Sequence, residues 1–178
     1  MKPFDLIKAD LYRHTGKVSL LLICKNLFNN NRSFKYTFWL RLANSHNFII
    51  RLLAKLMHQH LSIKYQIQIP VKTQIGPGLY LGHASSLMIN STAVIGLNCN
   101  LSQFTTIGSN HGKAAVIGNN VYIGPNVCLV EAVNIGDYAT IGAGAVVVKN
   151  VPSNMTAVGN PARLILNKEP GRYILNTI

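Results

Sequence analysis

The sequence predicts a mainly β chain, in which a parallel β-helix of stacked six-residue units follows an α-helical cap. A branched aliphatic residue recurs every six positions over the last two thirds of the chain, and glycine follows it at eight of the fourteen glycine positions. The first 60 residues lack this repeat and show helical spacing instead. A period of six fits neither the 3.6-residue period of a helix nor the two-residue period of a flat sheet. We therefore expect a solenoid.

The aliphatic repeat falls into three runs separated by two slips. A slip of two residues follows Leu81, and a slip of four residues follows Ile107. Each unit is predicted to be a short strand and a corner, whose aliphatic side chain stacks on its copies in neighbouring coils. The glycine beside it allows close backbone approach or an unusual φ. The aliphatic positions are Ile63, Ile69, Ile75 and Leu81; Ile89, Ile95, Leu101 and Ile107; and Ile117, Ile123, Leu129, Ile135, Ile141 and Val147.

The first 60 residues are predicted to form at least two helices, because apolar residues recur at helical spacing and three asparagines at 29–31 interrupt them. These helices are expected to cover the open end of the solenoid. We divide the chain into a basic helical region over 1–62, a β-helix over 63–155 and a tail over 156–178.

The charge of the chain is concentrated in its first third. The formal net charge is +12, and residues 1–64 hold eleven Lys and Arg against two acids, a net of +9. Hydrophobic residues make up 48% of the chain, which indicates a folded protein. The basic region would attract a polyanion such as an acidic polysaccharide, or contact an anionic membrane surface. No nucleic-acid-binding motif accompanies it, so no nucleic-acid partner is expected.

The three cysteines, Cys24, Cys99 and Cys128, form neither a metal-binding pattern nor a disulfide framework. A reducing cytoplasm and no bound metal are therefore expected. The N-terminus lacks the apolar core of a signal peptide, and the longest apolar run, residues 18–24, is too short to span a bilayer. We expect a cytoplasmic protein, at most in contact with the inner face of the cell membrane.

Each slip in the repeat carries a histidine: His83 follows the first aliphatic run, and His111 lies in the segment 109–115. In an otherwise regular solenoid, an interruption of the repeat indicates a functional site. An aliphatic hydroxyl becomes a good nucleophile only when its proton is removed, and imidazole titrates near neutral pH. His83 is therefore the candidate general base for attack by a hydroxyl group.

The repeat over residues 60–165 resembles the hexapeptide-repeat acyltransferases. The stretch 75–83 (IGPGLYLGH) and the stretch 159–163 (GNPAR) resemble the serine acetyltransferase branch. The short chain, residues 88–90 (MIN) and the short 109–115 loop resemble most closely the capsular polysaccharide O-acetyltransferases of the colanic acid type. The resemblance implies a left-handed β-helix with three hexads per coil, acetyl-CoA as acetyl donor, and a homotrimer with active sites between neighbouring subunits.

The resemblance also implies roles for individual residues. His83 matches the catalytic histidine of the family, and Gln68 stands where an acidic residue orients that histidine. His111 either takes part in catalysis or binds the acceptor or CoA. Backbone N–H groups near Gly108 and Ser109 would stabilise the oxyanion that forms during attack. The acetyl-CoA groove would be lined by Gly108, Ser109, Pro125 and Ala143, with Arg163 near the phosphates.

Several departures from serine acetyltransferases bear on the acceptor. Gly82 and Gln68 replace two acids, Ala114 replaces a second histidine, and the helical region is much shorter. Without these carboxylates an amino acid's ammonium group loses its partners, so L-serine is expected to be a poor acceptor. The sequence-based interpretation is therefore O-acetylation of a hydroxyl group in an anionic bacterial capsular or surface polysaccharide. Serine O-acetyltransferase of cysteine biosynthesis and a non-catalytic β-helix scaffold are the alternatives.

Overall fold

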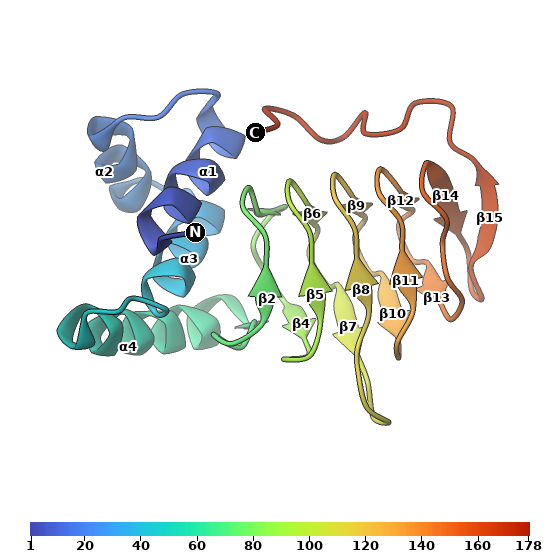
Figure 1. Ribbon diagram of the computed structural model, residues 1–178, viewed down its shortest axis with the longest axis horizontal. Helices are drawn as coiled ribbons and strands as arrows, with labels where there is room; N and C mark the ends of the chain where they lie inside the picture. The colour runs from blue at the N-terminus through green and yellow to red at the C-terminus, as the bar shows by residue number, and fades with distance from the viewer.

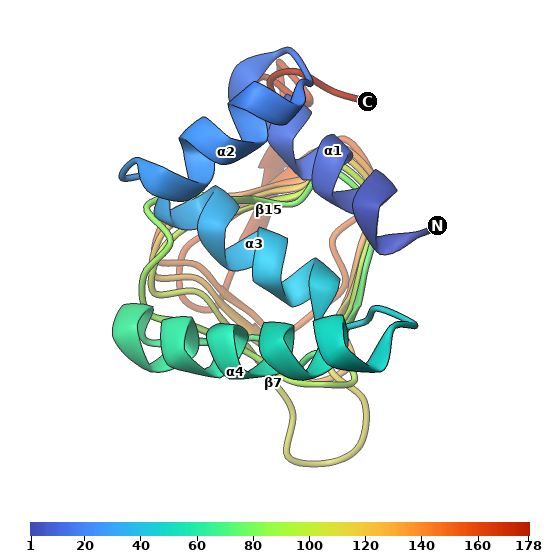
Figure 2. The same ribbon diagram turned by 90° about the vertical axis from the view of Figure 1, so that its left-hand side faces the viewer.

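The computed structural model describes residues 1–178 and shows a solenoid of short parallel strands with four helices at its N-terminal end (Figure 1). Followed from the helices toward the far end, the coils wind in the left-handed sense (Figures 1 and 2). The predicted left-handed parallel β-helix with an N-terminal helical cap is confirmed.

Of the four helices, which we call the cap, three begin at a polar capping residue. Ser19, Asn31 and Asn47 each accept a hydrogen bond from a first-turn N–H group of the helix that follows. The predicted break at residues 29–31 separates the second helix from the third. Viewed along the solenoid axis, the cap lies across the first coil (Figure 2). The helices are α1 (Pro3–Thr15), α2 (Leu20–Phe28), α3 (Arg32–Leu42) and α4 (Phe48–Tyr65).

The strands form three sheets, one on each side of the triangular solenoid. Sheet A contains β1 (Ile67–Gln68), β4 (Leu87–Ile89), β7 (Thr106–Gly108), β10 (Cys128–Val130) and β13 (Val146–Val147). Sheet B contains β2 (Gln74–Ile75), β5 (Val94–Ile95), β8 (Val116–Ile117) and β11 (Asn134–Ile135). Sheet C contains β3 (Tyr80–Leu81), β6 (Asn100–Leu101), β9 (Tyr122–Ile123), β12 (Thr140–Ile141), β14 (Met155–Val158) and β15 (Arg163–Leu166).

Strand register confirms three hexads per coil and locates both slips. Paired residues of β9 and β12 are 18 apart, whereas those of β3 and β6 are 20 apart and those of β6 and β9 are 22 apart. The two longer coils contain the predicted slips of two and four residues. Ile117 pairs with Ile135, which pairs in turn with Val151, so these three residues share one face as the repeat requires.

The aliphatic positions of the repeat form the solenoid core, with one exception. From Ile69 to Val147 they are buried or, for Ile75, partly buried against the core. Ile63 is wrong as a repeat position: it lies in α4 and is 75% exposed, because that helix continues to Tyr65 and the first strand begins only at Ile67. The glycines serve close packing, since a Cβ atom on Gly76 would lie 2.7 Å from the backbone of Gly96 in the next coil.

After β15 the chain returns along sheet C toward the cap, so both termini lie near one another (Figure 1). The Tyr173 ring lies 4.5 Å from the Tyr122 ring, and the backbone N–H of Ile178 donates to Asn98 Oδ1. The Asn176 side chain donates to the carbonyl of Arg13 in α1. The tail therefore ties the far end of the solenoid to the cap.

The outer surface of α4 is apolar and basic. Five large apolar side chains of this helix are between 49% and 68% exposed, beside Arg51 and Lys55. No helix in the structure combines the length and the apolar character needed to cross a bilayer. Contact of this region with a membrane surface remains a prediction. The five side chains are Phe48, Ile49, Leu52, Leu53 and Leu56.

Candidate active site

His83 lies on a bend at the edge where the chain leaves sheet C and enters sheet A. The two-residue slip distorts this corner, so that His83, Ala84 and Ser86 all have a positive φ, which is +58° at His83. A positive φ also occurs at regular corners of this solenoid, such as those at Phe104, Asn126 and Tyr138, so this corner differs in having three such residues within four positions. The slip thus leaves the His83 side chain exposed and without a hydrogen-bond partner in the chain.

A cavity of about 440 Å³ lies beside His83, between the cap and the first coil. Its walls come from three places: α1, the turn that leads into α3, and the strand β3 with the bend after it. Helix and solenoid residues meet here because the cap covers the open end of the first coil. The lining residues are His14, Asn30, Asn31, Arg32, Ser33, Tyr80, Leu81 and His83.

The inner wall of this cavity is held by Ser33 at the start of α3. Its Oγ atom accepts from the Leu81 N–H at 3.1 Å and lies 3.1 Å from His14 Nε2. The Ser33 hydroxyl proton is thus available to a neutral His14 imidazole. Burial, helped by the nearby Arg13, lowers the pKa of His14 from 6.5 to about 4. His14 is therefore an uncharged wall of the cavity at neutral pH.

This lowered pKa predicts a pH dependence of stability. Because the folded-state pKa of His14 lies below the unfolded value, its contribution is present above about pH 6.5 and is lost as the pH falls toward 4. We expect the free energy of unfolding to fall less steeply over this range in His14→Gln than in the wild type. Urea denaturation at each pH measures this. An exposed-site control, His60→Gln, should keep the wild-type slope, and a His14→Gln slope equal to the wild type would contradict the assignment.

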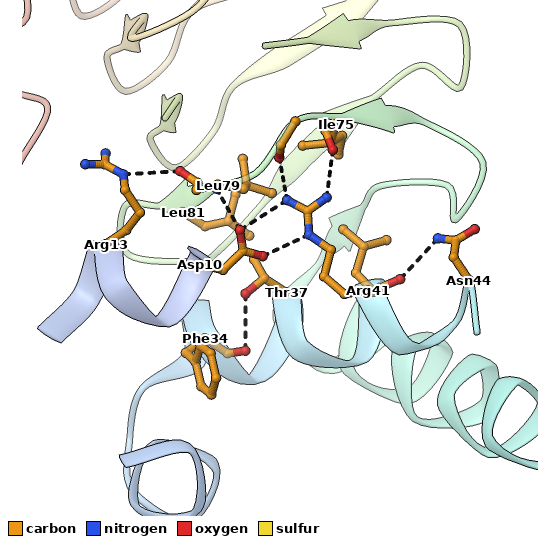
Figure 3. Close-up of polar contacts among 12 residues, drawn as sticks. Asp10, Arg13, Phe34, Thr37, Arg41, Asn44, Ile75, Leu79 and Leu81 are labelled. Carbon is orange, nitrogen blue, oxygen red and sulfur yellow. Dashed lines mark hydrogen bonds and ion pairs between the residues drawn. The ribbon is translucent and has the colours of Figure 1, made fainter. Parts of the chain in front are cut away.

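A buried ion pair fixes the loop that leads into β3 (Figure 3). Asp10 of α1 accepts two hydrogen bonds from Arg41 of α3, at 2.9 and 3.1 Å, and a third from the Leu79 N–H at 2.9 Å. Arg41 also donates to the carbonyl oxygens of Ile75 and Gly76 at 2.8 and 2.7 Å. Burial raises the pKa of Asp10, and the adjacent Arg41 opposes that shift. The helical spacing of apolar residues in the sequence did not predict the ion pair between Asp10 and Arg41.

Three of the predicted groove residues share one edge of the solenoid with His83. Leu81 pairs with Leu101 in the next coil. The residues two positions later, His83 and Gln103, therefore occupy the same corner of successive coils. The turns at Pro125 and Ala143 continue this edge. The Asn126 N–H donates to the Gln103 carbonyl, and the Gly144 N–H donates to the Pro125 carbonyl.

Arg163 lies at the far end of this edge, where it begins β15 opposite Val158 of β14. The side chain is exposed and belongs to neither of the two ion pairs in the chain. The structure therefore brings Pro125, Ala143 and Arg163 into one line that starts at His83.

The remaining predicted site residues lie away from this line. Gln68 faces outward on sheet A and lines a separate cavity with Ser62, Gln66 and Ser86; no hydrogen bond joins it to His83. Gly108 and Ser109 lie at the edge where the chain leaves sheet A, opposite the edge that carries His83. Within one chain, Gly108 and Ser109 are thus separated from His83 by the width of sheet A.

Glu131 organises the 109–115 loop that carries His111, a role that the sequence did not suggest. Its carboxylate accepts from Ser109 Oγ at 2.6 Å and from the backbone N–H groups of Asn110 and His111 at 3.1 and 3.3 Å. These bonds, led by the one from Ser109, lower the pKa of Glu131. The loop projects from the solenoid surface (Figure 2).

The cysteines lie apart from His83. Cys99 is fully buried in the core, and burial raises the pKa of its thiol to about 12. Cys128 is half-buried on sheet A, and Cys24 is exposed on α2. No group of three or more His, Cys, Asp or Glu side chains is placed to hold a metal ion.

Residues 114–149 match the family described as bacterial transferase hexapeptide (six repeats). The mitochondrial serine acetyltransferase 3 of Arabidopsis thaliana is 37% identical over 123 residues, which are 67% of this chain and 32% of that protein. Serine acetyltransferase of Escherichia coli K12 is 34% identical over 119 residues, covering 65% of this chain and 44% of that protein. The chain thus spans less than half the length of these curated relatives.

Solved structures extend the similarity to the cap. The soybean serine acetyltransferase apoenzyme superposes with a TM-score of 0.76 at 30% identity, covering 92% of this chain and 69% of that one. Neisseria gonorrhoeae serine acetyltransferase in complex with serine gives a TM-score of 0.71 at 27% identity, covering 92% and 69%.

These relatives correct the predicted acceptor. They are serine acetyltransferases, so the interpretation as a polysaccharide O-acetyltransferase is wrong, and the similarity favours the serine acetyltransferase alternative. That interpretation depended partly on the positive charge of the N-terminal region. Part of this charge is structural, since Arg41 is buried against Asp10 and Arg13 donates to the Gly78 carbonyl at 3.2 Å. With the repeat, the cap and these relatives in agreement, the chain belongs to the hexapeptide-repeat transferases, in their serine acetyltransferase branch.

Proposed function

We propose that this chain is an acetyl-CoA-dependent serine O-acetyltransferase with His83 as its general base. The observation that carries the proposal is the similarity to serine acetyltransferases over 92% of the chain, including the cap that forms one wall of the His83 cavity. The exposed histidine on a distorted corner supports the same reaction. The non-catalytic scaffold alternative gives no reason for this placement.

In the proposed reaction His83 takes the proton from the serine hydroxyl as its oxygen attacks the acetyl carbonyl carbon. Acetyl-CoA supplies the acetyl group as a thioester. The bond between the carbonyl carbon and sulfur breaks as the ester bond forms, and His83 returns the proton to the departing sulfur. A positioned general base is worth on the order of 10²–10⁴-fold in rate.

The edge that runs from His83 to Arg163 fits a long donor such as acetyl-CoA. Small residues leave it open: Gly144, with φ of +70°, has no heavy atom within 4 Å of where a Cβ atom would lie. Exposed Arg163 at its end suits the phosphates, because guanidinium pairs with phosphate oxygens in a forked geometry. Pro125 and Ala143 would line the middle of the groove.

A homotrimer would complete the site. His83 and the Gly108–Ser109 backbone lie at opposite edges of sheet A, so one chain cannot bring them to the same acetyl group. A neighbouring subunit could place its 109–115 loop beside His83, where its N–H groups would stabilise the oxyanion and His111 would contact a substrate. The exposed apolar side chains of sheet A, including Met88 and Val130, suit such an interface.

The proposed activity is tested by incubating the purified chain with acetyl-CoA and L-serine and measuring the release of free CoA thiol and the formation of O-acetylserine. We expect turnover that saturates in both substrates. Omitting L-serine gives the background rate of hydrolysis. A folded protein that binds acetyl-CoA but transfers no acetyl group to L-serine would contradict the proposal.

A further inference from the structure

The cavity beside His83 contains one formal charge, and it is positive. Arg32, the first residue of α3, is exposed and takes part in neither of the two ion pairs of the chain. Its guanidinium carbon lies 5.7 Å from the centre of the Tyr65 ring, which supports the group by a cation–π contact. Arg32 is therefore the charged group that this cavity offers to a ligand.

None of the five acidic residues lines this cavity. Asp10 is buried against Arg41, and Glu131 is bonded to the 109–115 loop. Asp137 accepts from a backbone N–H, and Glu169 pairs with Arg172. The last acid, Asp5, is exposed in the first turn of α1. The 109–115 loop, which a neighbouring subunit would contribute, contains Lys113 and His111 but no acid, and the Glu131 carboxylate beside it already accepts hydrogen bonds from Ser109, Asn110 and His111.

We propose that this cavity binds the hydroxylated acceptor by its carboxylate, through Arg32, and does not require the ammonium group. The inference rests on the proposed serine acetyltransferase activity and extends it to acceptor class: hydroxy acids without an amino group become substrates. An ammonium group would enter a site without a counter-charge, whereas a carboxylate would gain a charge-assisted hydrogen bond from Arg32.

Four acceptors that differ in these two groups test the proposal, with kcat/KM measured by CoA release. L-Serine carries both groups, 3-hydroxypropionate lacks the ammonium, and serinamide and ethanolamine lack the carboxylate. We expect 3-hydroxypropionate to remain within about tenfold of L-serine, and the two amines to lose on the order of 10–100-fold, the range for one lost charged hydrogen bond. The reverse order, with amines accepted and 3-hydroxypropionate inert, would refute carboxylate recognition while leaving the acetyltransferase activity intact.

Variants at Arg32 distinguish a role of this residue in binding the acceptor carboxylate from a purely structural role. Arg32→Gln should raise KM for L-serine and 3-hydroxypropionate by on the order of 10–100-fold and leave serinamide unchanged. Arg32→Lys should restore part of the loss, because it keeps the charge without the forked geometry. Lys25→Gln removes an exposed charge from α2 and should leave all four acceptors unchanged. If Arg32→Gln raised KM equally for the carboxylate acceptors and for serinamide, the result would contradict the proposal.

A binding measurement keeps the inference independent of turnover. Isothermal titration calorimetry should detect 3-hydroxypropionate binding to the wild type and at least tenfold weaker binding to Arg32→Gln. Wild-type protein that binds ethanolamine but not 3-hydroxypropionate would overturn the inference whether or not acetyl transfer is observed. Absence of transfer to every acceptor, with carboxylate binding retained, would instead overturn the proposed function.

Discussion

Substitution of His83 is expected to lower kcat by on the order of 10²–10⁴-fold, because the acceptor hydroxyl then loses its general base. The backbone at this residue makes the choice of substitution important. His83 has φ of +58°, a conformation that asparagine adopts readily and alanine does not. Asparagine already occupies it at four corners of this solenoid, Asn98, Asn120, Asn126 and Asn154. His83→Asn therefore removes the imidazole with little backbone strain, whereas His83→Ala adds strain to the loss of the base.

Both His83 variants should keep acetyl-CoA binding, and His83→Asn should keep the wild-type melting temperature. Steady-state kinetics with L-serine gives kcat, and equilibrium titration gives the affinity for acetyl-CoA. His60→Ala, at an exposed site on α4, serves as the matched control and should retain full activity. His83→Asn with near wild-type kcat, together with an inactive His111→Ala, would assign the base to His111 instead.

Breaking the ion pair between Asp10 and Arg41 is expected to destabilise the fold by about 3–5 kcal/mol, the usual cost of leaving one buried charge without its partner. Asp10 is 0% exposed and Arg41 5% exposed, so water cannot replace the lost partner. Asp10→Ala also removes the acceptor for the Leu79 N–H. The cap would then hold the loop before β3 less firmly (Figure 3). His83 follows two residues after the end of β3.

Urea denaturation of Asp10→Ala, Arg41→Ala and a double variant Asp10→Leu/Arg41→Met measures this effect at one fixed protein concentration. The double variant should recover a large part of the loss, because it removes both charges and leaves apolar volume in their place. Asp5→Ala, an exposed acid of the same helix, should change the unfolding free energy by less than about 1 kcal/mol. A loss below about 1 kcal/mol in Asp10→Ala would show that the pair does not hold the cap in place.

The sequence alone determined the solenoid. Stacked coils repeat the same contacts every turn, so the aliphatic positions, their glycines and both slips are visible as a period of six, and strand pairing reproduces that register. The exception was Ile63, where a helix happens to place an isoleucine six residues before the first true repeat position. His83 could be singled out for the same reason, since an interruption is conspicuous in a regular repeat.

Only the tertiary structure decided what surrounds His83. The cavity wall is built from residues far from His83 in the sequence: His14 from α1, and Arg32 and Ser33 from α3. The Asp10–Arg41 pair between α1 and α3 joins residues 31 positions apart and leaves no periodic signal in the sequence. The charges that lie near the acceptor could not be inferred from the net charge of +9 on residues 1–64 either. A sum of charges does not distinguish Arg41, buried against an acid, from Arg32, exposed in the cavity, and this distinction depends on three-dimensional packing.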